Sequence, residues 1–85
     1  MNLKQEVITM SKELTKESVK YLVSRLLENA NEATEESRSD RSDLFAAGRK
    51  LAYYEMLDIL KSELDVRDQN LKYYGLNVDL ERQFI

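Results

Sequence analysis

The fold of this chain is decided by the segment Ser37-Arg38-Ser39-Asp40-Arg41-Ser42-Asp43, which separates two long stretches of helix-forming residues. Serine and aspartate side chains compete for nearby backbone hydrogen bonds, so they favour turns and helix caps over helix interiors. Elsewhere the chain has no proline and only two glycines, Gly48 and Gly75. The segment therefore predicts one polar turn, over residues 37–42, between two helices.

The stretch before the turn has the apolar spacing of an amphipathic helix over residues 16–36. Its apolar residues recur at intervals of three or four, at Val19, Leu22, Leu26, Ala30 and Ala33. Thr15 is a suitable N-cap for this helix. Apolar residues at helical spacing in residues 1–14 do not continue this stripe in phase, so we expect a separate arm or short helix there.

The stretch after the turn predicts a second helix over residues 43–74, with Asp40 or Ser42 as its N-cap. Its apolar face is broad and consists of Leu44, Phe45, Gly48, Leu51, Ala52, Met56, Ile59 and Leu60. Poor helix formers can interrupt this helix near residues 65–70. Gly75 suits a left-handed position that would pair Leu76 with Leu71 in a Schellman motif. A short tail helix is expected over residues 79–84, capped by Asn77 or Asp79.

These elements predict an all-α fold built on an antiparallel helical hairpin. Two helices of about 21 residues are each about 32 Å long, and a short turn makes them neighbours. A chain of 85 residues has a marginal core. Because the second helix has more apolar surface than one partner helix can cover, we expect a homodimer in the form of a four-helix bundle. Gly48 and the neighbouring alanines would let backbones approach closely.

Composition excludes several classes of function. The chain has no cysteine and no histidine, which removes disulfides, thiolate nucleophiles, Cys/His zinc sites and histidine general bases. No apolar run approaches the ~20 residues of a membrane span, and residues 1–14 lack the apolar core of a signal peptide. We therefore expect a cytoplasmic protein. Its net charge of −3 argues against binding nucleic acid.

The turn is locally basic within this acidic chain. Residues 37–50 contain Arg38, Arg41, Arg49 and Lys50 against two aspartates. Arg41 precedes a helix N-terminus, and both attract anions. One hypothesis is therefore that an oligomer sequesters a small anionic ligand, such as a signalling nucleotide, at this end.

Arginine and tyrosine side chains follow the turn at helical spacing. Arg49 and Tyr53 are four residues apart, and such pairs either stack on a ring and contact phosphate or form interface hot spots. The surrounding segment Phe45-x-x-Gly48-Arg49-x-x-Ala52-Tyr53-Tyr54-Glu55-Met56-Leu57 resembles one in small uncharacterised helical proteins of Gram-positive bacteria and their phages or mobile elements. That resemblance implies a helical hairpin and carries no established activity.

A carboxylate pattern gives a catalytic alternative. Glu32-x-x-Glu35 and Glu55-x-x-Asp58 resemble the signature of the all-α nucleoside triphosphate pyrophosphohydrolases, in which such carboxylates hold Mg²⁺ over a triphosphate. In a hairpin with a short turn, however, Glu35 and Glu55 lie about 15 Å apart along the axis. We expect Glu55 to be half-buried, with Arg25 as a candidate partner.

The favoured interpretation is a self-associating helical module that acts by binding a protein partner and uses no cofactor. The expected contact residues are Arg41, Phe45, Arg49, Tyr53 and Tyr54. The anionic-ligand and Mg²⁺-dependent hydrolase hypotheses remain as alternatives, together with acidic faces that mimic nucleic acid.

Overall fold

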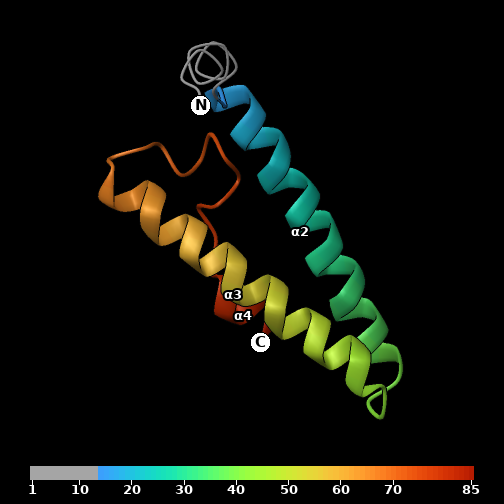
Figure 1. Ribbon diagram of the computed structural model, residues 1–85. Helices are drawn as coiled ribbons and strands as arrows, with labels where there is room; N and C mark the ends of the chain where they lie inside the picture. The colour runs from blue at the N-terminus through green and yellow to red at the C-terminus, as the bar shows by residue number, and fades with distance from the viewer. Residues whose placement is uncertain (1–13) are drawn as a thin grey trace, which may run out of the picture.

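The structure, a computed structural model, describes residues 14–85, which form a helical hairpin and a short C-terminal helix (Figure 1). Helix α2 spans Lys16–Ser39, α3 spans Leu44–Val66 and α4 spans Leu80–Phe84. The two long helices are antiparallel and in contact, so the predicted all-α hairpin with a tail helix is confirmed. The arm predicted for residues 1–14 lies outside the described residues, apart from Leu14.

Helix α2 begins where the sequence predicts and ends later. The Thr15 hydroxyl accepts a hydrogen bond from the Ser18 backbone N–H at 3.0 Å, as expected for an N-cap. The helix continues to Ser39, three residues beyond the predicted end at 36. Serine and arginine are tolerated in a last helical turn, and the Asp40 N–H still bonds to the Glu36 carbonyl at 3.1 Å.

The predicted cap of α3 is wrong, because the turn uses both candidates internally. The Asp40 carboxylate accepts hydrogen bonds from the Ser42 hydroxyl at 2.6 Å and from the Ser42 N–H at 3.0 Å. These two hydrogen bonds hold the pKa of Asp40 below its usual value, and the bond from the Ser42 hydroxyl has the larger effect. Asp43 is the N-cap instead, with its carboxylate accepting from the Ala46 N–H at 3.0 Å.

Helix α3 ends at Val66 rather than at residue 74. Asp68 takes a left-handed conformation, with φ of +56°. The Asp68 N–H bonds to the Asp65 carbonyl at 3.0 Å, and the Gln69 N–H bonds to the Leu64 carbonyl at 2.9 Å. This pair of bonds is a Schellman motif, with aspartate at the position where glycine is usual. It stops the helix within the segment of poor helix formers.

A second Schellman motif follows at Gly75, whose φ is +76°. The Leu76 N–H bonds to the Leu71 carbonyl at 2.9 Å, and the Gly75 N–H bonds to the Lys72 carbonyl at 3.1 Å. The predicted pairing of Leu71 with Leu76 is therefore confirmed, although the residues before Gly75 form a turn and not the end of a long helix.

The core lies between the hairpin and the tail that follows α3. Its buried residues are Val23, Ala30, Leu57, Tyr74, Leu76, Leu80 and Phe84. Within this cluster α3 supplies Leu57, whereas the tail supplies four of the seven residues. After α3 the chain returns along the hairpin and places α4 beside α3 (Figure 1). The tail therefore covers one side of the hairpin and leaves another side of α3 open.

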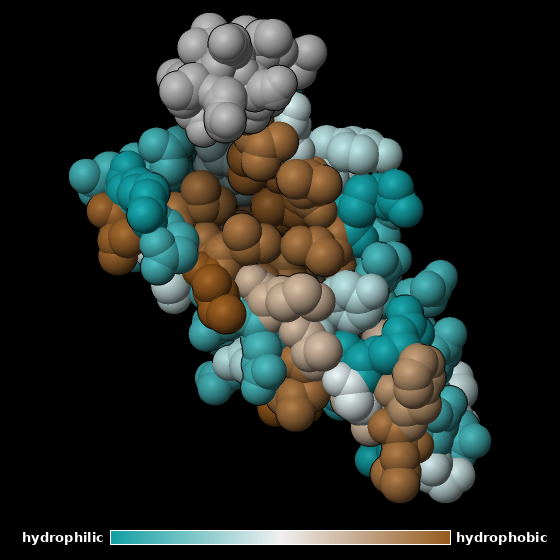
Figure 2. Space-filling model, in the orientation of Figure 1, coloured by the Kyte–Doolittle hydropathy of each residue, from teal (hydrophilic) through white to brown (hydrophobic). Residues whose placement is uncertain are grey.

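The open side of α3 is apolar. Six large apolar side chains of this helix are exposed, namely Leu44, Phe45, Leu51, Met56, Ile59 and Val66. Figure 2 shows apolar side chains gathered around a hollow where α2 and α3 diverge. Within residues 14–85, no helix is long and apolar enough to cross a bilayer.

Candidate functional site

Arg49 and Tyr53 join α3 to α2. The Arg49 guanidinium forms an ion pair with Glu36 at 2.9 Å and a longer one with Glu32 at 3.8 Å. It also lies 5.8 Å from the centre of the Tyr53 ring. The Tyr53 hydroxyl accepts a hydrogen bond from the Asn29 amide at 3.3 Å. These two predicted contact residues are thus brought together, and both interact with α2 of their own chain.

Tyr54 faces a different surface from Tyr53. It lines a cavity of about 430 Å³ together with Asp58, Asp79 and Glu81. Burial, followed by the negative charges of Asp58, Glu81, Asp79 and Glu55, raises the pKa of the Tyr54 hydroxyl. Adjacent positions on a helix point about 100° apart, so Tyr53 and Tyr54 do not share one binding site.

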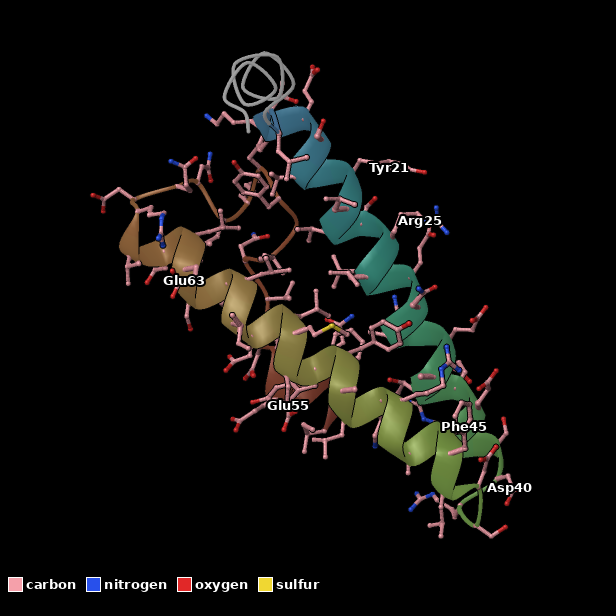
Figure 3. The ribbon with its side chains drawn as sticks, in the orientation of Figure 1. Tyr21, Arg25, Asp40, Phe45, Glu55 and Glu63 are labelled. Atoms are coloured by element: carbon pink, nitrogen blue, oxygen red, sulfur yellow. The ribbon has the colours of Figure 1, made fainter. Side chains whose placement is uncertain are left out.

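Phe45 and Arg41 lie at the turn end of the hairpin. Phe45 is 76% exposed in the first turn of α3 (Figure 3). Arg41 is exposed in the turn itself. The structure therefore does not gather the five predicted contact residues at one site, although it brings Arg49 and Tyr53 into contact.

The four carboxylates of the hydrolase alternative are not assembled. Glu32 pairs with Arg49, and Glu35 pairs with Arg38 at 2.8 Å on its own helix. Among residues 14–85 there is no group of three or more acidic, histidine or cysteine side chains that could hold a metal ion. Glu55 and Asp58 lie on α3, whereas Glu32 and Glu35 lie on α2.

The predicted environment of Glu55 is wrong. Glu55 is exposed on the side of α3 that faces away from α2 (Figure 3). Arg25 lies on the outer side of α2, where it forms an ion pair with Glu28 at 3.5 Å and donates to the Tyr21 hydroxyl at 3.2 Å. The reason is the rotation of α3, which buries Ala46 and Leu57 and turns Leu44, Gly48 and Leu51 outward.

The exposed side of α3 carries a regular apolar stripe. It consists of Phe45, Ala52, Ile59 and Val66, which are spaced seven residues apart and are all exposed. We call these four residues the heptad stripe. A strict seven-residue repeat keeps one helix face against a partner helix over several turns. Sequence reasoning included most of these residues in a broader face, but the spacing alone could have singled them out.

An apolar groove of about 330 Å³ borders this stripe. It lies between α2 and α3 and is lined mainly by Leu14, Val19, Leu22, Val23, Leu26 and Leu60. Met56, which is 41% exposed, lies three residues before Ile59 and four before Leu60 on the surface of α3. The apolar groove can accept the apolar face of another helix.

Gly48 makes no close approach within the chain. A Cβ atom added at Gly48 would have no atom within 4 Å. The small residue therefore leaves free space beside the heptad stripe, and the close approach of backbones expected in a dimer stays a prediction.

A scan against protein-family models found no matching family, and searches of the curated proteins and of the solved structures found no significant match.

Proposed function

We propose that this protein is a small helical interaction module that self-associates through the heptad stripe of α3. The single observation that carries the proposal is the stripe itself: Phe45, Ile59 and Val66 are 76%, 62% and 71% exposed. Exposed apolar side chains that occur singly are ordinary, but four at a constant spacing of seven form a row along one helix that a partner helix can follow, although the residues between them, Gly48, Glu55 and Ser62, are not apolar.

Charge supports a second copy of the chain as the partner. Residues 44–54 of α3 contain Arg49 and Lys50 and no acidic residue, whereas residues 55–65 contain four acidic residues and one lysine. An antiparallel pair of α3 helices places the acidic half of each copy beside the half of its partner that contains no acidic residue, which keeps like charges apart. A two-fold axis between the helices satisfies both copies at once, as in most homodimers.

The expected affinity is moderate. Fully burying a large apolar side chain contributes about 1.5–3 kcal/mol, and the stripe offers three in each copy. Association costs about 4–15 kcal/mol in lost freedom of motion, so only part of this gain remains. The dimer should therefore form within roughly 1 µM to 1 mM, which corresponds to about −8 to −4 kcal/mol.

Sedimentation equilibrium across that concentration range tests the proposal. The wild-type chain should shift from monomer to dimer, and Ile59→Glu should remain monomeric because it places a charge in the stripe. Ser24→Glu is the matched control, since it adds the same charge at an exposed position on α2. A wild-type chain that stays monomeric throughout, or an Ile59→Glu dimer as strong as that of the control, would refute self-association through this stripe.

A further inference from the structure

A second cavity lies at the turn end of the molecule, where α2, the turn, α3 and α4 meet. Its volume is about 220 Å³. Four basic side chains line it, namely Arg38, Arg41, Lys50 and Arg82, and no acidic side chain does. These four residues come from four separate elements, so the folded chain concentrates positive charge at one concave place on an acidic protein.

Three of these cations form no ion pair with a described residue. Within residues 14–85, Arg41, Lys50 and Arg82 form no ion pair. Arg38 pairs with Glu35, but both side chains are well exposed, and such pairs are weak. A concave site with uncompensated positive charge raises the local concentration of anions.

A buried hydroxyl points independently to a ligand. Ser37 lines the cavity and is only 9% exposed. Its hydroxyl makes no hydrogen bond to any residue from 14 to 85, whereas the neighbouring Thr34 hydroxyl donates to the Ala30 carbonyl at 2.7 Å. A buried polar group without a partner costs free energy, and native structures retain few of them. A bound acceptor would satisfy Ser37.

We propose that this cavity binds the phosphate group of a small phosphorylated molecule. Arginine donates two parallel hydrogen bonds to phosphate oxygens, lysine adds a point charge, and the Ser37 hydroxyl donates to a further oxygen. A phosphomonoester carries about two negative charges near pH 7, which the three unpaired cations can compensate.

The size of the cavity limits the ligand. Pockets that enclose drug-sized molecules measure about 300–1,000 Å³, and this one is smaller at about 220 Å³. It therefore holds the phosphate and the atoms next to it, while any larger group attached to the phosphate stays outside. The site is built from one chain, so it does not depend on self-association through the heptad stripe.

Binding is measured by ¹⁵N–¹H nuclear magnetic resonance titration with inorganic phosphate, ribose 5-phosphate and adenosine monophosphate, with sodium chloride as the ionic-strength control. Saturable shifts are expected at backbone amides of residues 34–42, 50 and 80–85, and not with chloride. Tighter binding of the two esters than of inorganic phosphate identifies a phosphorylated metabolite as the ligand, and equal binding identifies free phosphate.

Variants separate a built site from general charge attraction. Lys50→Gln and Arg82→Gln should each weaken binding about tenfold or more, because each removes a charge-assisted hydrogen bond. Lys72→Gln removes the same charge from an exposed position outside the cavity and should leave binding unchanged. Ser37→Ala should weaken binding while unfolding at the same temperature as the wild type.

Two results would overturn the proposal. One is the absence of saturable shifts with all three phosphate compounds at millimolar concentrations. The other is an equal loss of binding in Lys72→Gln and in the two cavity variants, which would assign the effect to net charge. Circular dichroism of each variant establishes that it is folded, and Ser37→Ala keeps the test decisive if Arg82→Gln unfolds α4.

Discussion

Replacing Gly75 by alanine tests whether the turn at Gly75, in the tail after α3, has a left-handed backbone conformation. The backbone at Gly75 has φ of +76°, where an L-residue costs about 1–2 kcal/mol relative to its ordinary conformations. Alanine also restricts the unfolded chain, which offsets about 0.4–1 kcal/mol. The new Cβ would lie 3.7 Å from Cδ1 of Leu27, an ordinary contact, so no clash adds to the cost. The net loss is therefore about 1 kcal/mol.

Thermal unfolding followed by far-ultraviolet circular dichroism measures this loss. For a domain of this size, 1 kcal/mol lowers the Tm by about 4–8 °C. Gly48→Ala is the matched control with the opposite sign, because Gly48 lies within α3 with free space around it and alanine favours a helix by about 1 kcal/mol. Both changes are made in the Ile59→Glu background, so that self-association does not contribute. A Tm for Gly75→Ala equal to or above that of its parent would refute the left-handed turn.

Three further perturbations follow from the same structure. Asp68→Gly should raise the free energy of unfolding by about 0.5–1 kcal/mol, because glycine adopts φ of +56° without the steric penalty that an aspartate has there. An unchanged midpoint of urea unfolding would contradict this expectation. Phe84→Ala should lower the free energy of unfolding by about 3–5 kcal/mol, out of a total of roughly 4–13 kcal/mol expected for 85 residues. If urea unfolding of this variant stays cooperative with a nearly unchanged midpoint, α4 is not part of the core. Ser42→Ala should raise the pKa of Asp40, read by carboxyl ¹³C titration. Because the pKa of Asp40 is lower in the folded chain, its carboxylate stabilises the fold at pH values above the unfolded pKa near 3.9, and this stabilisation is lost as the pH falls through the folded pKa. If the pKa of Asp40 is the same in Ser42→Ala, the hydrogen bond from the Ser42 hydroxyl is not the cause of the lowered pKa.

Local features of the fold could be predicted because their causes are local. The cap at Thr15, the polar turn and the left-handed Gly75 each depend on residues within four or five positions. The end of α3 could be placed only approximately, because propensity marks a weak segment without showing which residue takes positive φ. Asp68 does so here, and an aspartate in that conformation is uncommon.

The burial of α3 could not be predicted because it depends on distant residues. The periodicity identified an apolar face of α3, but Leu57 is buried in a cluster that includes residues of the tail as well as of α2. The rotation of α3 that buries Leu57 leaves Glu55 exposed to solvent. For the same reason, the basic turn was visible in the sequence, while the addition of Arg82 to Arg41 and Lys50 required the path of the tail. The cavity exists only because α4 returns to the turn end.

The division of the core between hairpin and tail also sets an order of folding. Burial of Val23 and Leu57 is complete only when Tyr74 and Phe84 of the tail pack into the same cluster. Both long helices can form early from local contacts, whereas joining α4 to α2 closes a loop of more than fifty residues, as from Asn31 to Gln83. A hairpin without its tail therefore exposes two apolar sides of α3 rather than one, and packing of the tail leaves the side with the heptad stripe accessible to a partner.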